Sequence, residues 1–282
     1  MSAHLKFRLA LMAFCCLLVP TLVFAHQPRV VESRQTTVAD PEISKAYYGQ
    51  LKGVPDVFTI RASSPFPLYV NILVPDIAGQ KKDVSATILK DGKLLATLDG
   101  GRFAWTKMFE PFGYDSYWTG PEYKARAEAG TYVVTVSSPQ NDSQYSLAIG
   151  EAEVFDFPEI MNALTLVPKL KKDFFHESPL GFILSPFGWG IILILYALAF
   201  AVGFLARLAV RMAANNSARS AGNNIGWAGR LLRLAIAMAI LAWAVTTSWS
   251  LPLIFLSGLV LFEAVFSWCA LFAAFGKSSC PR

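Results

Sequence analysis

Apolar residues dominate the last third of the chain, and the lengths of their runs predict membrane helices. The 29 residues of 178–206 carry no charge, and a bilayer span needs about 20 apolar residues, so we expect one transmembrane helix at 186–206. The 43 residues of 234–276 contain a single charge, which is enough chain for two crossings. Polar residues and a proline at 246–252 divide this run, because proline cannot continue a helix. The pattern predicts an α-helical three-span membrane domain whose last two spans form a hairpin at 234–276.

The first residues follow the pattern of a secretory signal peptide. Lys6 and Arg8 precede an uncharged run at 9–24, and Ala25 supplies the small residue that a signal peptidase requires. The alternative is a retained anchor helix, but the run is short for a bilayer span. We therefore predict that residues 1–25 are a signal peptide, cleaved after Ala25, and that the next segment is exported.

The segment 26–156 alternates apolar and polar residues in short runs that are separated by Gly, Pro and Asp. The runs with the two-residue period of half-buried strands are 56–61, 68–74, 84–89, 93–98, 131–136 and 144–149. Asp91-Gly92 is typical of a tight hairpin turn between two of them. Because no helical period lies between the runs, we predict an all-β exported domain, an antiparallel β-sandwich, at 26–156.

Aromatic residues gather at 103–123, where the alternation breaks down. Two prolines and two glycines lie among them, so we predict a long loop or inserted lobe. Tyr and Trp often anchor binding surfaces, and the candidates for contact with a ligand or partner are Trp105, Phe109, Tyr114, Tyr117, Trp118 and Tyr123. The alternative is that these rings close one end of the sandwich as a small core. Glu110, Asp115 and Glu122 lack the spacing of a calcium loop, so we expect them at a solvated surface.

Residues 157–185 join the predicted head to the first span. Apolar residues recur with helical spacing at Ile160, Met161, Leu164, Val167 and Leu170, and Pro168 interrupts them. An amphipathic helix of this kind can lie at a membrane surface. We therefore predict a juxtamembrane amphipathic segment that lies on the outer leaflet and orients the head.

Charge is distributed unevenly along the chain. Residues 26–185 hold 16 Lys and Arg against 19 Asp and Glu, so the head lacks the basic surface that a nucleic acid would need. Residues 207–233 hold five arginines and no acid, as is typical of a cytoplasmic loop. We predict a multi-pass protein of the cell (inner) membrane with residues 26–185 extracytoplasmic and the tail 277–282 cytoplasmic. The lipid bilayer is then one partner.

The head shows no recognisable catalytic motif. Its two histidines, His26 and His176, lie outside any triad, metalloprotease or nucleotide-binding pattern, so we predict a non-enzymatic protein without a cofactor. One alternative is copper. After cleavage His26 would offer both its amine and its imidazole, with His176, Met108 or Met161 as a further ligand.

The tail carries paired motifs that resemble a known membrane domain. The motifs are Asn223-Asn224-Ile225-Gly226, Arg230 and Arg233, Cys269, and Gly276-Lys-Ser-Ser-Cys280. Residues 223–282 thereby resemble the YgaP-like inner-membrane transmembrane domain, a helical hairpin that occurs alone or fused to rhodanese-type sulfurtransferases. This chain has Gly229 where the family usually has an acid and Ala270 where it has proline, and it shows no rhodanese-like active-site loop. The resemblance implies a packing or dimerisation module.

Two features of this tail are candidates for chemistry. Cys269 and Cys280 suggest an alternative function, a membrane component of sulfur or thiol redox handling, with packing as the competing interpretation. Glu263 is the only ionisable residue of the predicted hairpin, and a carboxylate in hydrocarbon is costly enough to suggest an ion or proton path. The competing interpretation is structural, with Glu263 protonated or bonded to one of several hydroxyls: Ser257, Ser267, Thr246 or Thr247.

The end of the head carries a second resemblance. Residues 130–138, followed by 145–150, are similar to the last hairpin of bacterial pre-peptidase C-terminal sandwiches, which are accessory and binding modules. Taken together, these patterns predict a membrane-anchored extracytoplasmic binding or assembly protein. Its further partner would be another protein or a second copy of this chain in the membrane.

Overall fold

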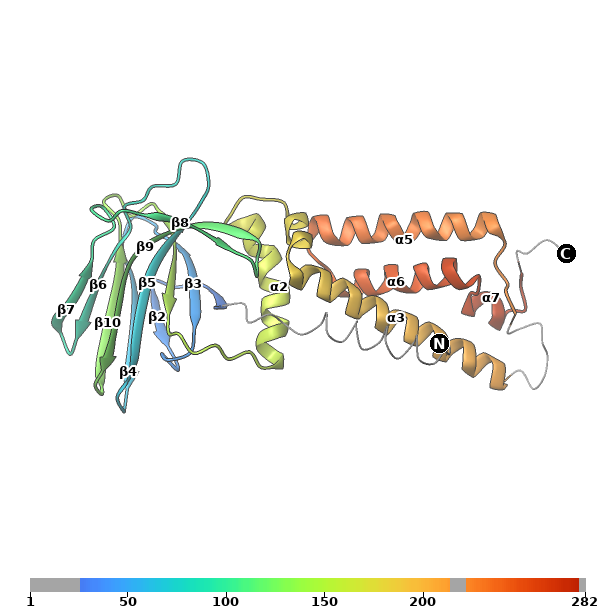
Figure 1. Cartoon of the computed structure of the whole chain (residues 1–282), viewed down its shortest axis with the longest axis horizontal. Helices are drawn as coiled ribbons and strands as arrows, with labels where there is room; N and C mark the ends of the chain where they lie inside the picture. The colour runs from blue at the N-terminus through green and yellow to red at the C-terminus, as the bar shows by residue number, and fades with distance from the viewer. Residues whose placement is uncertain (1–25, 214–221, 279–282) are drawn as a thin grey trace, which may run out of the picture. The chain divides into compact units, whose positions relative to one another are not determined.

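The structure is a computed structural model that describes residues 26–213 and 222–278. The predicted signal peptide at 1–25 and the last four residues lie outside the described residues. The chain divides into two compact units, the first ending at Glu177 and the second beginning at Ser178. Figure 1 labels the helices and strands of both units.

The first unit contains two β-sheets that form a sandwich (Figure 1). Sheet A holds, in spatial order, β1 (Gln27–Val30), β3 (Lys45–Gln50), β11 (Gln144–Ile149), β5 (Phe66–Pro75), β9 (Asp115–Ala127) and β8 (Thr106–Glu110). Sheet B holds β2 (Gln35–Val38), β4 (Asp56–Ala62), β10 (Gly130–Ser137), β6 (Ser85–Lys90) and β7 (Lys93–Leu98). The predicted all-β sandwich is therefore confirmed. The β1–β3 and β2–β4 pairs are parallel, whereas the other paired strands are antiparallel.

The core lies between the two sheets and follows from the alternation of side chains along each strand. In β10, Tyr132, Val134 and Val136 are buried, and the residues between them are half-buried. From sheet A, Tyr145 crosses the core and donates a hydrogen bond of 2.7 Å from its hydroxyl to Asp56 Oδ2 on β4. This buried bond ties the central strand β11 to the opposite sheet.

The six runs with a two-residue period all form strands, namely β4, β5, β6, β7, β10 and β11. The sequence did not indicate β1, β2 and β3, of which β1 and β2 are only four residues long. The predicted loop at 103–123 is wrong. Most of it is a hairpin formed by β8 and the 13-residue strand β9, and Gly120 and Pro121 lie within β9 close to a register shift opposite Asn71 and Leu73.

Helix α2 (Phe157–Asp173) covers the outer face of sheet A (Figure 1). It begins at Asp156, whose carboxylate accepts a 2.9 Å hydrogen bond from the Glu159 amide and so caps the first turn. The helix continues through Pro168, contrary to the interruption predicted there. Its apolar side, including Val167 and Leu170, packs on the sheet. The head therefore buries the C-terminal part of the predicted apolar stripe, whereas Ile160 is 43% exposed, and a position on the outer leaflet stays a prediction.

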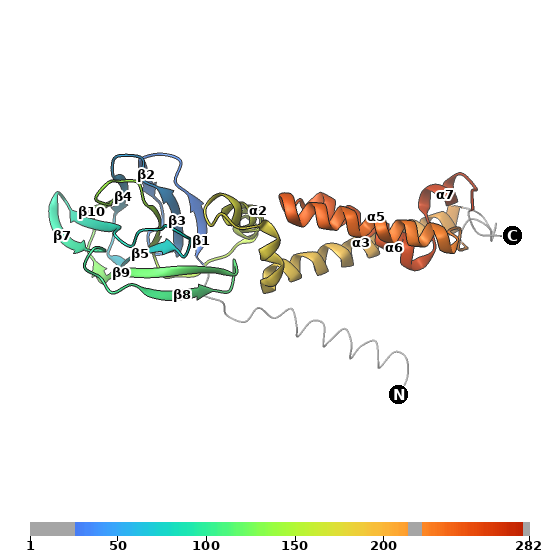
Figure 2. The same ribbon diagram turned by 90° about the horizontal axis from the view of Figure 1, so that it is seen from above.

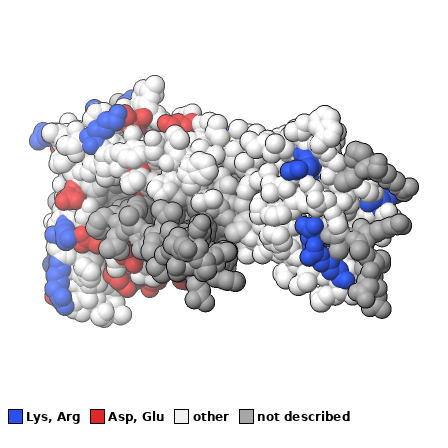
Figure 3. Space-filling model, turned by 45° about the vertical axis from the view of Figure 1, so that its right-hand side comes forward, with Lys and Arg blue, Asp and Glu red and all other residues white. Residues whose placement is uncertain are grey.

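The second unit is helical (Figure 2). Its described elements are η1 (Pro179–Leu184), α3 (Pro186–Ala213), α5 (Trp227–Thr247), α6 (Leu251–Phe266) and α7 (Ala270–Ala274). Helices α5 and α6 lie side by side, and α3 packs against α6. Residues 186–212 and 227–247 are long and apolar enough to cross a membrane, whereas α6 is apolar but has 16 residues. Figure 3 shows few charged side chains on the visible face of this unit.

The helical boundaries refine the predicted hairpin. The break falls where the sequence placed it, since α5 ends at Thr247 and α6 begins at Leu251, one residue before Pro252. Helix α6 does not run on to Gly276, as the apolar run had suggested. Ser267 adopts a left-handed conformation with φ of 54° and ends the helix, and the short helix α7 follows.

Candidate functional site

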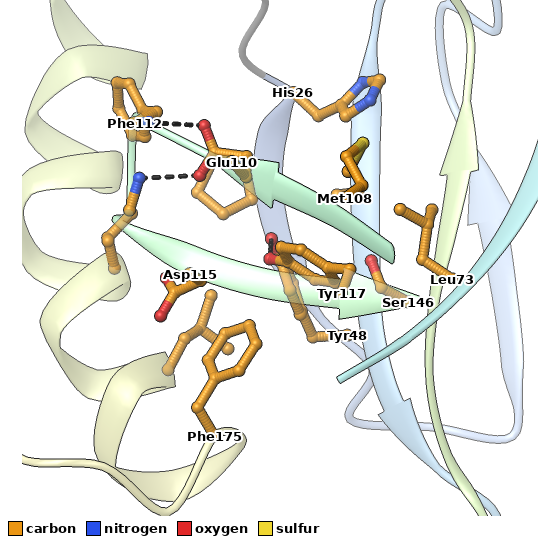
Figure 4. A pocket seen from close by; sticks show the side chains of 15 residues that line it. His26, Tyr48, Leu73, Met108, Glu110, Phe112, Asp115, Tyr117, Ser146 and Phe175 are labelled. Carbon is orange, nitrogen blue, oxygen red and sulfur yellow. Dashed lines mark hydrogen bonds between the residues drawn. The ribbon is translucent and has the colours of Figure 1, made fainter. Parts of the chain in front are cut away.

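A cavity of about 40 Å³ lies between the outer face of sheet A and helix α2. Its floor crosses the sheet, because Tyr48 on β3, Ser146 on β11 and Leu73 on β5 are register partners in neighbouring strands. Val167 and Leu170 of α2 cover this floor. Figure 4 shows the side chains that line the cavity.

The β8–β9 hairpin forms one wall of the cavity. Side chains alternate along a strand, so Met108 and Glu110 of β8 project to the same side. Across the hairpin Met108 pairs with Tyr117, and Glu110 pairs with Asp115. All four side chains line the cavity (Figure 4). The polar and thioether groups of this segment therefore lie on the side of the hairpin that faces the cavity.

Glu110 closes the turn of this hairpin from inside. Its two carboxylate oxygens accept hydrogen bonds of 2.6 and 2.7 Å from the amides of Phe112 and Gly113 (Figure 4). A side chain at position 113 would lie 2.3 Å from Asp115 Oδ2, so glycine permits this close approach of two acidic residues. Burial raises the pKa of Glu110 to about 7, although the two amide donors oppose the rise.

Asp115 is held by a lysine from α2. Lys171 Nζ donates to Asp115 Oδ1 at 2.6 Å and to the Tyr114 carbonyl at 3.1 Å, and the side chains of Lys171 and Asp115 are 0% and 4% exposed. Burial raises the pKa of Asp115 to about 6, against the opposing attraction of Lys171. The prediction that Glu110 and Asp115 lie on a solvated surface is therefore wrong. The third acid, Glu122, is exposed as expected.

Two tyrosines complete the polar lining. The hydroxyl groups of Tyr48 and Tyr117 lie 3.0 Å apart, and the Tyr117 ring meets Phe175 edge to face with centroids 5.2 Å apart. Burial raises the pKa of both tyrosines, so their hydroxyls stay protonated and act as neutral hydrogen-bonding groups.

His26 and Met108 lie at one end of the cavity, next to each other in the view of Figure 4. His26 is exposed and Met108 is 37% exposed, so this end is open to solvent. The His26 Nδ1 atom is hydrogen-bonded to the hydroxyl of the buried Ser44. Of the copper ligands suggested by the sequence, His26 and Met108 both line the cavity, whereas His176 and Met161 do not.

The structure divides the six aromatic residues singled out in the sequence into two groups. Phe109 and Tyr114 are 52% and 40% exposed, and their rings meet edge to face with centroids 5.0 Å apart. The remaining rings pack into the fold: Trp105, Tyr117, Trp118 and Tyr123. The packing interpretation therefore describes these four rings, and a binding role for Phe109 and Tyr114 stays a prediction.

The packed rings hold the hairpin on the sandwich. Trp105 and Tyr123 pack partly against the core between the sheets, and the Trp105 indole donates to a backbone carbonyl 2.8 Å away. The Trp118 indole donates to Asp76 Oδ1 at 2.9 Å, and the Lys82 ammonium lies 3.7 Å above its ring. The two indole N–H groups are thus engaged within the fold, and Phe109 and Tyr114 are the more exposed pair.

In the helical unit, Glu263 is paired rather than isolated. Arg233 Nε donates to Glu263 Oε2 at 2.8 Å, which links α5 to α6. The hydroxyl partners suggested by the sequence are wrong, because the Glu263 carboxylate is bonded to an arginine. Arg230, one turn before Arg233 on α5, also donates to α6, at the Ala264 carbonyl. The ion pair gives Glu263 a structural role in this unit.

Cys269 is 3% exposed and lies in the bend between α6 and α7. The Asn224 side chain clamps this bend by donating to the Cys269 carbonyl at 2.9 Å and accepting from the Cys269 amide at 2.8 Å. The second thiol candidate, Cys280, lies outside the described residues. The clamp gives the Asn-Asn motif of the sequence a structural role.

Within residues 26–213 and 222–278, no group of three or more His, Cys, Asp or Glu side chains could hold a metal ion. A site in this part of the chain would therefore need a ligand of another type, such as a thioether.

The comparisons with known proteins concern the two units separately. Residues 221–282 match the family described as "Inner membrane protein YgaP-like, transmembrane domain", which confirms the resemblance of the tail and supports a membrane location. The pre-peptidase C-terminal domain of a collagenase from Bacillus anthracis is similar at 10% identity and a TM-score of 0.25, over 44% of this chain and 95% of that domain. A family 35 carbohydrate-binding module from an environmental isolate is similar at 14% identity and a TM-score of 0.24, over 38% of this chain and 79% of the module. No curated protein matches the chain.

Sequence reasoning missed the residues that α2 and β3 contribute to the site. Lys171 continues the spacing of Ile160, Leu164 and Val167 and so falls on the apolar stripe of α2, where a lysine needs a buried partner. A lysine on an apolar stripe was therefore the sequence feature that could have indicated the buried ion pair. Tyr48 lies in β3, which the pattern did not predict, and nothing in the sequence placed it opposite Tyr117.

Proposed function

We propose that this chain is a membrane-anchored, extracytoplasmic binding protein without catalytic activity, and that its head binds a small cation in the cavity between sheet A and α2. The observation that carries this proposal is the convergence of donor groups on one small cavity. An imidazole, a thioether and two carboxylates line a space of about 40 Å³. A cavity of that size holds a few water molecules or a single ion, and it excludes an organic substrate.

Binding is favoured over catalysis by the way the acidic groups are used. Both oxygens of Glu110 accept backbone amide bonds, and Asp115 is paired with Lys171. A general base must instead present its free lone pair to a substrate within hydrogen-bond reach. The hydrogen bonds of the two carboxyl groups therefore give the site rigidity, and the imidazole and the thioether remain as its ligands for a cation.

The experiment is a binding survey on the whole purified protein in detergent. After treatment with a chelator, the protein is dialysed separately against calcium, zinc, copper(II) and copper(I), and the bound metal is measured by mass spectrometry. We expect one ion to remain at about one equivalent and to raise the thermal unfolding midpoint, because a ligand that binds the folded state stabilises it. Retention of none of the four ions would overturn the proposal.

Variants at one position test whether the cavity is the place of binding. Ser146 is 2% exposed and lies on the cavity floor. The Ser146→Val variant adds volume to the floor and should abolish retention, whereas Ser146→Ala leaves the space open and should keep it. Circular dichroism establishes that both variants fold. Equal retention by a folded Ser146→Val protein would contradict the assignment.

A further inference from the structure

We propose that the bound cation is copper(I) and that its ligands are the His26 imidazole and the Met108 thioether at the open end of the cavity. This inference rests on the proposed function, since it names the ion that the head would bind. Both side chains line one cavity although 82 positions separate them in the sequence, because the β8–β9 hairpin approaches β3, the neighbour of β1, where the hydroxyls of Tyr117 and Tyr48 lie 3.0 Å apart.

The types of donor select the metal. Thioether sulfur is a soft ligand that favours copper(I), and imidazole is a good ligand for copper. Calcium and magnesium require several oxygen ligands, and structural zinc requires four ligands from His, Cys, Asp or Glu. In the part of the chain that the structure describes, no group of three or more such side chains is arranged to hold a metal ion. Copper(I) has a closed d shell and accepts two or three ligands, so the pair of His26 and Met108 is sufficient for it.

The surroundings of His26 resemble those of a metal ligand. Its Nδ1 atom is hydrogen-bonded to the Ser44 hydroxyl, which fixes the orientation of the ring, and Nε2 is the nitrogen that the proposal assigns to the metal. Ligand histidines characteristically use the second ring nitrogen for such an outer hydrogen bond. Ser44 is itself 2% exposed, so the supporting group is held in place.

The Met108 thioether lies where it can bind an ion in the cavity. Met108 lies on the cavity side of β8, two residues before Glu110 and opposite Tyr117. Its exposure of 37% provides a path by which an ion can enter from solvent.

The test measures the copper(I) affinity of the whole protein without oxygen, in competition with a chromogenic copper(I) chelator. The protein carries Cys269→Ser and Cys280→Ser, because free thiolates would bind copper(I) themselves. Loss of an outer-sphere partner costs about 10- to 100-fold in metal affinity, so loss of a direct ligand should cost about 100-fold or more. We therefore expect that loss in Met108→Leu and in His26→Gln.

Matched controls come from the same unit. Met161→Leu and His176→Asn remove the same donor types at positions outside the cavity lining, and they should keep the wild-type affinity. Copper X-ray absorption should show a sulfur neighbour that disappears in Met108→Leu. The thermal midpoint of each metal-free variant establishes that it folds, and mass spectrometry of the intact protein identifies its first residue.

The outcomes separate this inference from the proposed function. Copper(I) affinity that is unchanged in a folded Met108→Leu protein, or a copper site without sulfur, overturns the inference. Retention of a different cation with no copper(I) overturns the inference and leaves the proposed function standing. Retention of no ion overturns both.

Discussion

Lys171 of helix α2 and Asp115 of strand β9 form an ion pair of 2.6 Å across 56 positions of sequence, and both side chains are inaccessible to solvent. The pair joins the helix to the hairpin that walls the cavity. Removing two charges from water is expensive, and the Coulomb attraction with additional hydrogen bonds must offset it. Lys171 satisfies this need with a second bond to the Tyr114 carbonyl.

Breaking this pair should destabilise the head strongly. Lys171→Met leaves the Asp115 carboxylate buried without its partner, for which we expect a loss of about 3–5 kcal/mol in the free energy of unfolding. Hydrogen exchange of peptides from β8 and β9, followed by mass spectrometry on the whole protein, reports this local loss of stability.

The double variant Lys171→Met/Asp115→Leu is the control. It removes both charges, and buried ion pairs replaced by apolar residues of similar size are often neutral or stabilising. We expect exchange near the wild-type rate. If the single variant changed exchange no more than the double variant, the pair would not be the connection between α2 and the hairpin.

The stability of the head should fall as pH rises from about 4.5 to about 7. Burial raises the pKa of Glu110 from 4.5 to about 7, so the folded state binds this proton more tightly than the unfolded state does. The Glu110 contribution is therefore greatest below pH 4.5 and is lost as pH passes through 7. At 1.36 kcal/mol per pKa unit the loss is at most about 3 kcal/mol. Asp115, with its pKa raised to about 6, adds a loss of the same sign.

The pH dependence is checked by thermal unfolding of the whole protein between pH 4 and 8. Glu110→Gln cannot ionise, so the decline with pH should be smaller in this variant. Glu122→Gln is the matched control, because Glu122 is exposed on β9, and it should retain the wild-type pH profile. A Glu110→Gln profile as steep as that of the wild type would contradict the assignment.

The sequence predicted the sandwich well because its strands obey a two-residue period, yet it failed at 103–123 for a physical reason. The alternation there is real, with Met108 and Glu110 facing α2, but both faces of the hairpin carry aromatic or polar side chains, so hydrophobicity does not alternate. Pro121 within β9 added a false breaking signal, which the register shift in the β5–β9 pairing accommodates.

The candidate site could be predicted only in part. His26 and Met108 were recognised as possible metal ligands by donor type alone, and only the folded structure shows that both line one cavity. Glu110 and Asp115 were assigned to the surface because acidic side chains are rarely buried. Their burial depends on α2, whose lysine at 171 lies 56 positions beyond Asp115, and no local pattern encodes such a pairing.

The Arg233–Glu263 pair should stabilise the packing of α5 against α6. Glu263→Gln leaves Arg233 without its counter-charge in an apolar unit. The free-energy cost of an arginine at the centre of a membrane helix is about 2.5–3.5 kcal/mol on the translocon-insertion scale. We expect a loss of about 1–3 kcal/mol, below that figure because the two side chains are 17% and 26% exposed. Unfolding by a denaturing detergent, followed by tryptophan fluorescence, measures it. The charge swap Arg233→Glu/Glu263→Arg should recover at least half of the loss, and its failure to do so would argue against a direct pair.

Two glycines of α3 provide a matched test of how closely α3 packs on α6. A Cβ atom at Gly203 would lie 2.5 Å from the ring of Phe262, which is 1% exposed and packed among other rings, whereas a Cβ atom at Gly190 would meet nothing within 4 Å. Gly203→Ala should therefore destabilise the helical unit by about 1–3 kcal/mol through overpacking. Gly190→Ala should be neutral or stabilising by up to about 1 kcal/mol, because alanine is the better helix former. The same detergent unfolding measures both variants, and equal effects at the two positions would contradict the close α3–α6 contact.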